Sequence, residues 1–265
     1  MASILSRLSL RIRRRESPFY DRLYRIAKSL RGISVPACRP LHSLLYGEWQ
    51  MRKDLWHNFW RVIYYEPMFK SQCASVGKNF HMEYAGNGST RVHGNLRITL
   101  GSNVHIFDNT QFVGLKLFDE PELIVGDDTY LGPAVYLMVG KRITIGSHCM
   151  IGSRIITDNP GHSINVMRRL ESGGGPPDKI GIRPVAVGDF CWLPLDTVVY
   201  PGVTIGDGVV VRMGTHIDRD VPPFCHAAGD PMRILRKLPI PEELRAVVGE
   251  ERYNRYLQIH AGLRL

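Results

Sequence analysis

The chain has 265 residues, of which 44% are hydrophobic and 22% are charged, a composition typical of a globular protein with one substantial core. No apolar run approaches the roughly 20 residues that a transmembrane helix needs, and the Arg-rich start lacks the features of a signal peptide. The five cysteines show no paired spacing, which indicates a reducing compartment without disulfides and favours a cytoplasmic location.

The net charge of +9 is concentrated near the N-terminus. Residues 1–33 hold nine of the 34 Lys and Arg residues but only two of the 25 Asp and Glu residues, so the remainder is nearly neutral. A charge run without a base-reading motif is weak support for nucleic-acid binding, and we expect no nucleic-acid partner.

Residues 1–70 are predicted to form a separate helical module. Phe19, Leu23, Ile26 and Leu30 recur at helical spacing, and a second helix is predicted over 41–64, where three of the four tryptophans lie. Basic, amphipathic and aromatic character together suggest that residues 1–65 bind an anionic membrane surface, at the cytoplasmic face of the inner membrane. In the alternative interpretation, the aromatic side chains only cap the end of the following domain.

Residues 71–237 carry a six-residue apolar period, which is strictest between residues 185 and 217. Such a period fits neither a helix nor an alternating strand, and it is typical of a parallel β-helix. Pairs of glycine with Ser or Asp, beginning at Gly101, Gly126, Gly146, Gly188 and Gly206, are predicted turns. The inward rows are Val187, Leu193, Val199, Ile205, Val211 and Ile217, and Val185, Cys191, Thr197, Val203, Val209 and Thr215.

The period breaks at 157–183 and resumes afterwards, so this stretch is predicted to be an excursion loop from a continuing coil. Long loops on a rigid scaffold commonly carry function. The loop contains His162, but no second histidine lies close to it in the sequence, and we expect no metal site. Residues 238–265 follow two prolines, and a C-terminal helix is predicted over about 241–259.

Five segments of the chain carry a resemblance to a known family: 155–162, 184–192, 201–209, 220–223 and 228–231. Through them, from about residue 95 to 237, the chain resembles the hexapeptide-repeat acyltransferases, most closely the O-acetyltransferase branch with the maltose, galactoside and polysaccharide acetyltransferases. The resemblance implies a mainly β fold, a left-handed parallel β-helix flanked by the helical N-terminal module and the C-terminal helix. It also implies a homotrimer that binds acetyl-CoA between neighbouring subunits.

The resemblance assigns His162 as the general base that takes the proton of the acceptor hydroxyl, and a neutral imidazole suits this task near neutral pH. Asp158 or a backbone carbonyl could orient its ring. For the donor, the resemblance indicates a turn tryptophan and a basic tail that meets the CoA phosphates, although both could be ordinary surface residues. The residues at these donor positions are Trp192, Arg212, Gly214, Arg233, Arg236 and Lys237.

Two bulky residues depart from the family pattern, which has small residues at these turns. Leu195 and Arg212 could narrow the channel for the pantetheine arm, or Arg212 could reach a CoA phosphate. We therefore predict an acetyl-CoA-dependent O-acetyltransferase acting on a saccharide hydroxyl, on a lipid-linked or surface glycan. The alternatives are a non-catalytic trimeric scaffold and an N-acetyltransferase of an amino sugar nucleotide.

Overall fold

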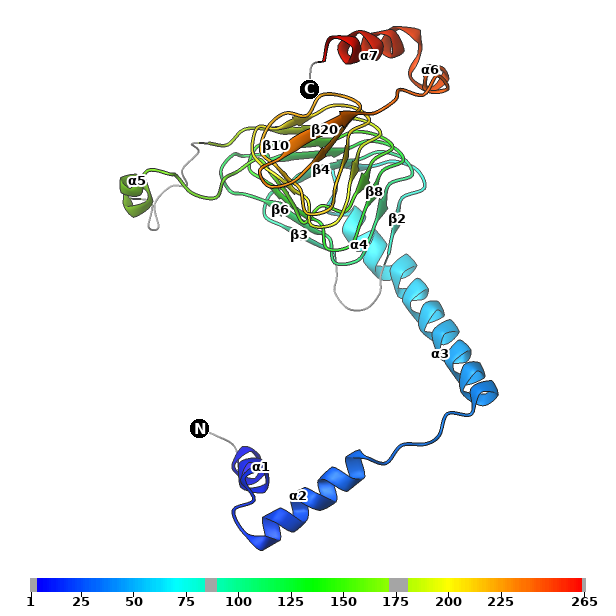
Figure 1. The fold of residues 1–265 in the computed structure, drawn as a ribbon, viewed down its shortest axis with the longest axis vertical. Coiled ribbons are helices and arrows are strands. Elements are labelled where there is room, and N and C mark those ends of the chain that lie inside the picture. The colour runs from blue at the N-terminus through cyan, green and yellow to red at the C-terminus, as the bar shows by residue number, and fades with distance from the viewer. Residues whose placement is uncertain (1–3, 84–89, 172–180, 264–265) are drawn as a thin grey trace. The chain divides into compact units, whose positions relative to one another are not determined.

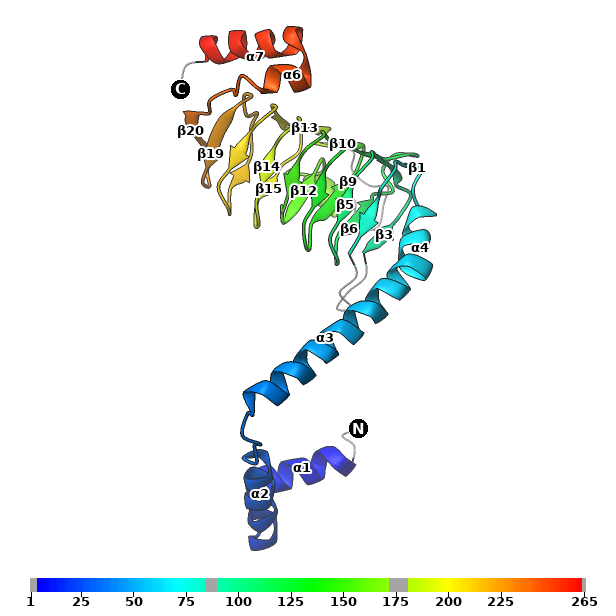
Figure 2. The ribbon, with the colours of Figure 1, turned by 90° about the vertical axis from the view of Figure 1, so that its right-hand side faces the viewer.

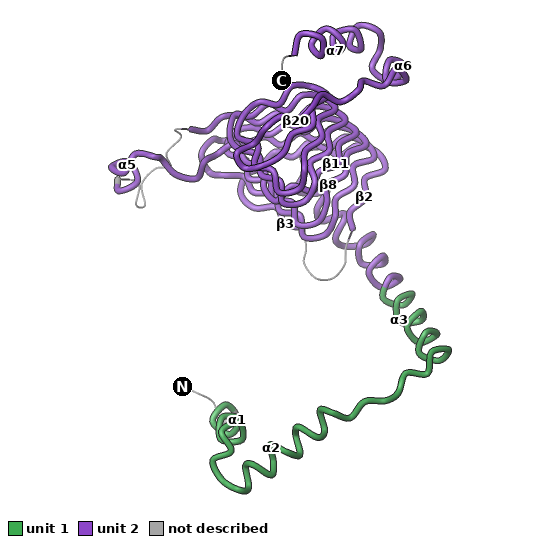
Figure 3. Tube along the Cα trace, in the orientation of Figure 1, with its two compact units in different colours: residues 1–53 green, residues 54–265 purple. Residues whose placement is uncertain are grey.

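The computed structural model describes residues 4–83, 90–171 and 181–263. The chain divides into two compact units, one ending at Lys53 and one beginning at Asp54 (Figure 3). The boundary lies within helix α3 (Arg39–Trp60).

The first unit is helical, with α1 (Ile4–Arg14), α2 (Pro18–Arg31) and the beginning of α3. Helix α2 begins where the Ser17 hydroxyl accepts the backbone N–H of Tyr20 and Pro18 occupies the first helical position. The sequence pattern predicted α2 but not α1, because leucines and arginines alternate along the sequence of α1. None of the side chains described in this unit is buried, and no described helix has the length and apolar character to cross a membrane.

The second unit is a parallel β-helix, and the view along it shows nested triangular coils (Figure 1). Each coil contributes one short strand to each of three sheets, here called A, B and C. Sheet A contains β1 (Ser75–Val76), β4 (Arg97–Leu100), β7 (Glu122–Val125), β10 (Arg142–Ile145), β13 (Val185–Val187) and β16 (Thr204–Ile205). Sheet C contains β3 (Arg91–His93), β6 (Gln111–Gly114), β9 (Tyr136–Val139), β12 (Ile155–Thr157), β15 (Val198–Val199) and β18 (His216–Ile217).

Sheet B runs the full length of the stack (Figure 2) and ends in the antiparallel pair of β19 with β20. Sheet B contains β2 (His81–Met82), β5 (His105–Ile106), β8 (Tyr130–Leu131), β11 (Met150–Ile151), β14 (Trp192–Leu193), β17 (Val210–Val211), β19 (Cys225–Ala228) and β20 (Arg233–Lys237). The short strands and the six-residue period have the same cause, because each side of the triangle consumes one repeat.

The two predicted inward rows are confirmed as core. Every side chain in the row from Val187 to Ile217 and in the row from Val185 to Thr215 is at most 3% exposed. The polar members of the second row bond to the backbone of their own corner: the Thr197 hydroxyl donates to Pro194 O (2.7 Å) and the Thr215 hydroxyl donates to Arg212 O (2.5 Å). Burying these hydroxyls is therefore not costly.

The glycine pairs are confirmed as corners, and their second residues form a ladder of side-chain bonds between coils. The backbone N–H of Ser102 donates to Asp127 Oδ1 (2.6 Å), that of Ser147 to Asp189 Oδ1 (2.7 Å) and that of Asp189 to Asp207 Oδ1 (2.8 Å). The glycine before each such residue lets consecutive corners approach. A Cβ at Gly126 would lie 2.7 Å from the carbonyl carbon of Gly146. We call Ser102, Asp127, Ser147, Asp189 and Asp207 the corner ladder.

Both ends of the coil carry helices. The π-helix η1 (Arg61–Tyr65) and helix α4 (Glu66–Lys70) precede the first coil, and Phe69 enters the core. At the other end, the expected C-terminal helix is found as two helices, α6 (Leu244–Val248) and α7 (Glu250–Gly262). They are separate because Gly249 adopts φ 82°, which breaks the helical path. Helix α7 contacts the corner ladder, since Arg252 Nη2 and Tyr256 Oη bond Asp207 Oδ2 at 2.9 and 2.6 Å.

Candidate active site

The excursion loop leaves the coil after β12 and returns before β13, at the corner where sheet C passes to sheet A. The backbone N–H of Arg183 donates to Asp158 O (2.9 Å), so the two ends of the loop are joined. Short helix α5 (Val166–Glu171) lies within the loop. Because its ends are tied to the scaffold, the loop presents its intervening residues from a fixed base.

Asp158 anchors this corner. Its side chain is fully buried, Oδ1 accepts the N–H of Gly140 (2.5 Å), and Oδ2 accepts those of Lys141 (2.6 Å) and Arg142 (2.8 Å). Burial raises the pKa of the Asp158 carboxyl, and these three donors act in the opposite direction. The bonds connect the loop to the turn between β9 and β10, which sequence reasoning did not anticipate. A role for Asp158 in orienting His162 stays a prediction.

His162 lies four residues further on and is exposed. The turn before it is fixed by Asn159, whose Oδ1 accepts the N–H of Gly161 (2.9 Å), and Gly161 adopts φ 90°. No residue in the described part of the chain hydrogen-bonds the His162 ring. Among the described residues, the His162 ring thus has both nitrogens available to a second molecule, as a base acting on a bound hydroxyl needs.

Four of the six candidate donor residues lie on sheet B, and the other two, Arg212 and Gly214, lie in the turn after β17. Trp192 is 52% exposed. The strand pairing of sheet B places four residues in one row across β14, β17, β19 and β20: Trp192, Val210, His226 and Arg236. Burial lowers the pKa of His226, and the nearby Arg236 and Arg212 lower it further. The guanidinium groups of Arg212 and Arg236 therefore lie near the His226 ring and form a basic cluster suited to phosphate. Sequence reasoning missed His226, because only the strand register places it beside the two arginines.

The remaining candidates have individual surroundings. Gly214 adopts φ 73° and its N–H donates to Leu195 O (3.2 Å), so Gly214 and Leu195 belong to adjacent turns. The side chain of Leu195 is 46% exposed. Arg233 is exposed at the start of β20. Lys237 Nζ donates to His260 O (2.5 Å), so its ammonium contacts helix α7.

The candidate base and the candidate donor surface do not meet within one chain. His162 follows the corner between sheets C and A, whereas Trp192 and Arg236 lie on sheet B. In a triangular coil that corner is opposite sheet B, and Figure 1 shows α5 and the strands β2 and β8 on opposite sides. No group of three or more His, Cys, Asp or Glu side chains suited to a metal occurs among the described residues.

Comparison with known proteins matches residues 184–219 to the hexapeptide repeat of succinyl-transferase. Galactoside O-acetyltransferase of Escherichia coli is 27% identical over 173 residues, which are 65% of this chain and 68% of that protein. A second E. coli relative, 30% identical over 118 residues, is named for colanic acid biosynthesis, and the match covers 44% of this chain. The chain spans 54–59% of the length of this and further curated relatives.

Among solved structures, the N-acyltransferase AntD from Bacillus cereus, in complex with dTDP and 3-hydroxybutyryl-CoA, matches with a TM-score of 0.51 at 20% identity. The match covers 73% of this chain and 94% of that chain, which supports a common fold. The repeat match, the named relatives and the three parallel sheets agree with one another. The chain therefore contains a hexapeptide repeat, is similar to named acetyltransferases and has the fold of a left-handed parallel β-helix.

Proposed function

We propose that this protein transfers an acetyl group from acetyl-CoA to a saccharide hydroxyl, with His162 as the general base. The observation that carries the proposal is an exposed His162 on a loop that Asp158 anchors to the coil. The names of the relatives support acetyl transfer and the acceptor class: galactoside O-acetyltransferase and a putative colanic acid biosynthesis acetyltransferase.

The reaction needs one proton carrier. The His162 imidazole takes the proton of the acceptor hydroxyl as its oxygen attacks the thioester carbonyl of acetyl-CoA. The tetrahedral intermediate collapses with cleavage of the carbon–sulfur bond, and the imidazolium returns the proton to the leaving thiolate. Backbone N–H groups at a coil corner would stabilise the oxyanion. The products are the acetyl ester and free CoA.

We propose that the working form is a homotrimer. His162 and the donor surface of Trp192, Arg212 and Arg236 lie on opposite sides of one coil, so a complete site needs residues from two copies. Gel filtration combined with light scattering tests this: a monomer that still transfers acetyl groups would contradict the trimer.

Release of free CoA in the presence of acetyl-CoA and methyl β-galactoside tests the transfer. We expect His162→Asn to lower kcat by about 10²- to 10⁴-fold, the usual contribution of a positioned base. His148→Asn is the matched control, because His148 is an exposed histidine at a coil corner, outside the excursion loop, and its φ of 56° suits asparagine. Equal loss in both variants, or none in His162→Asn, would count against His162 as the base.

The same assay separates the competing functions. An amino sugar acceptor that reacts when all hydroxyl acceptors fail would indicate an N-acetyltransferase. A protein that binds neither CoA nor acetyl-CoA in calorimetry would be a non-catalytic scaffold, with Leu195 and Arg212 closing the channel.

We further propose that the N-terminal helices bind the anionic cytoplasmic face of the inner membrane, and that the acceptor is lipid-linked. In α2, Phe19 and Leu30 are 65% and 61% exposed, although both are apolar. The last turns of α1 and α2 carry five basic residues, and the first turns of the two helices carry one acidic residue, Asp21. An apolar stripe beside basic side chains is suited to a charged lipid surface.

Sedimentation with phosphatidylserine-containing vesicles tests this part. Each neutralised cation near the surface removes about 1 kcal/mol, so Arg22→Gln with Lys28→Gln should weaken binding on the order of 30-fold. Pure phosphatidylcholine vesicles provide the control. Binding that is indifferent to lipid charge and to salt would contradict the proposal.

A further inference from the structure

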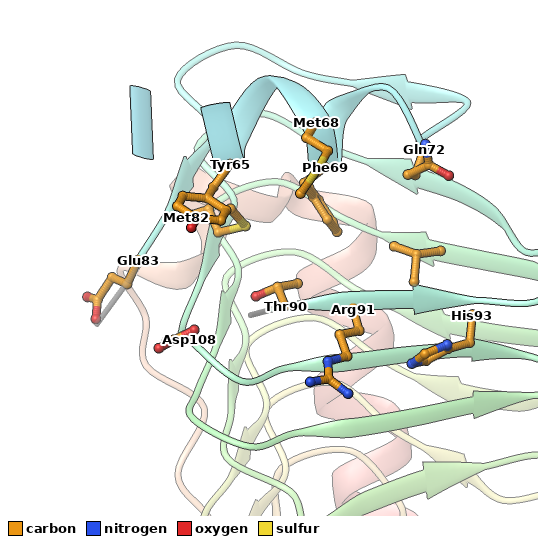
Figure 4. A pocket seen from close by; sticks show the side chains of 11 residues that line it. Tyr65, Met68, Phe69, Gln72, Met82, Glu83, Thr90, Arg91, His93 and Asp108 are labelled. Atoms are coloured by element: carbon orange, nitrogen blue, oxygen red, sulfur yellow. The ribbon is translucent and has the colours of Figure 1, made fainter. Parts of the chain in front are cut away.

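A cavity of about 320 Å³ lies at the first coil of the β-helix (Figure 4). Strands β19 and β20, which carry part of the donor surface, lie at the other end of the stack (Figure 2). Its walls come from η1 and α4 on one side and from the ends of β2 and β3 on the other. Its aromatic and polar lining includes Tyr65, Phe69, Gln72, Thr90, Arg91 and Asp108.

The apolar part of this cavity is made of closely packed side chains. Phe69 is 4% exposed, stacks on Phe80 with ring centroids 5.6 Å apart, and packs against Phe112 at 5.4 Å. Met82 is also 4% exposed. These contacts build the floor of the cavity from buried side chains of the core, which is typical of a preformed site.

The polar part includes a hydroxyl that has no partner. Thr90 Oγ1 is buried and makes no hydrogen bond to any described residue. An unpaired buried hydroxyl is costly, and a ligand that supplies a donor or acceptor removes that cost. Gln72 adds an amide with both donor and acceptor atoms.

The charges around the cavity are of both signs. Arg91 and His93 lie opposite Glu83 and Asp108, and Asp108 Oδ1 accepts the N–H of Asn109 (2.9 Å). An anionic ligand would meet two carboxylates, and a cationic ligand would meet a guanidinium. A neutral molecule with many hydroxyls and one apolar face satisfies this lining, because hydroxyls donate to carboxylates and accept from Arg, Gln and Thr.

We propose that this cavity is a second, non-catalytic saccharide-binding site, which holds one sugar unit of an acceptor glycan. The sugar ring packs its apolar face on Phe69 and Tyr65, and its hydroxyls bond Thr90, Gln72 and Arg91. This inference rests on the proposed function in taking a saccharide as the acceptor, but the site is separate from His162.

Sheet C connects the cavity to the excursion loop. The register aligns Arg91, Gln111, Tyr136 and Ile155 in one outward row across β3, β6, β9 and β12. Three strand spacings make this row roughly 14 Å long. Strand β12 leads directly to Asp158 and His162. A glycan of several units that lies along this row reaches from the cavity to the loop, so the cavity would favour long acceptors over single sugars.

Calorimetric titration of the full chain with a galacto-oligosaccharide, without acetyl-CoA, tests the site. We expect Thr90→Val to weaken binding about three- to tenfold, because it removes one hydrogen bond and keeps the side-chain shape. Gln72→Ala, at an exposed position, should weaken binding comparably. Gln111→Ala is the control for the row outside the cavity, and its effect should be smaller. Thermal unfolding of each variant confirms that the fold is intact.

The transfer assay distinguishes this site from the catalytic one. Thr90→Val should raise KM for the oligosaccharide by the same factor, with kcat and the KM for methyl β-galactoside unchanged. Unaltered oligosaccharide affinity in both cavity variants, or no oligosaccharide binding by the unmodified protein, would overturn the second site. Failure of the unmodified protein to acetylate any acceptor while it binds the oligosaccharide would instead overturn the proposed function alone.

Discussion

The β-helix and the N-terminal helices of this chain contain similar proportions of apolar residues but use them in opposite ways. In the coils, Phe112, Leu137 and Ile156 are fully buried, and each coil bonds to the next through backbone and corner side chains. In the first unit, Leu44 is 74% exposed and none of the described side chains is buried. The β-helix is stabilised by its own core, whereas the exposed apolar side chains of the N-terminal helices are suited to contact with a partner.

Core truncation should show this difference most strongly. Phe112→Ala removes a fully buried ring and should lower the free energy of unfolding by about 3–5 kcal/mol. Leu44→Ala, in α3, should change it by less than about 0.5 kcal/mol. Chemical denaturation followed by tryptophan fluorescence measures both. A large loss in Leu44→Ala would mean that α3 is already buried in solution, for example between copies.

Glycine substitutions sharpen the comparison, because their effects should have opposite signs. At Gly126 a Cβ would lie 2.5 Å from Ser147 Oγ and 2.7 Å from the Ser147 backbone, so Gly126→Ala should destabilise the coil by about 1–3 kcal/mol. At Gly47, in α3, a Cβ would meet nothing within 4 Å. Gly47→Ala should therefore stabilise helix α3 locally by about 1 kcal/mol and raise its helicity. Circular dichroism and thermal unfolding report both. Equal effects would contradict the contrast between the two regions.

The periodic part of the fold was predictable because every repeat performs the same physical task. Leu193, Val199 and Ile205 each fill one side of a triangle, so their spacing alone identified the β-helix and its core. The end of the chain was less predictable, since a single residue, Gly249, divides the C-terminal helix. In α1, apolar and basic residues alternate along the sequence, and the resulting helix is amphipathic because Leu8 and Ile12 share a face four residues apart.

The candidate site was predictable only where it depends on local sequence. The loop and His162 follow from the interruption of the repeat, and their catalytic role stays a prediction. His226 joins Arg212 and Arg236 through strand register, and Lys237 contacts His260 across 23 residues. Such pairings depend on which coil stacks on which. The cavity at the first coil depends on the same stacking, together with the placement of α4.

The contact of α7 with the corner ladder should respond to acid. Burial raises the pKa of Asp207, but hydrogen bonds from Tyr256 and Arg252 outweigh this and hold it below the usual 3.8. A lowered folded pKa contributes stability that is complete above pH 3.8 and is lost as the pH falls through the folded pKa. Tyr256→Phe should cost about 1.5 kcal/mol near neutral pH and reduce this acid dependence.

The control for this prediction is Tyr253→Phe. Tyr253 is buried on the same helix, and its ring lies under the Arg245 guanidinium, 4.9 Å from the ring centroid. The free energy of unfolding, measured by denaturation across the acid range, should keep its full pH dependence in this variant. If Tyr256→Phe and Tyr253→Phe reduce the pH dependence of the free energy of unfolding equally, Asp207 is not the group that titrates.

The smallest effect should occur in the N-terminal helices, where capping rather than burial determines helicity. The Ser17 hydroxyl accepts the Tyr20 N–H (3.4 Å), so Ser17→Ala should weaken α2 by about 0.5–1 kcal/mol without moving the unfolding midpoint of the β-helix. Ser29→Ala is the matched control. Its hydroxyl bonds Ile26 O within the helix, and alanine there should raise helicity. Anionic vesicles should suppress the Ser17→Ala effect, because an apolar surface that stabilises the helix makes its cap less important. Loss of helicity that persists on vesicles would mean that α2 does not fold against the lipid.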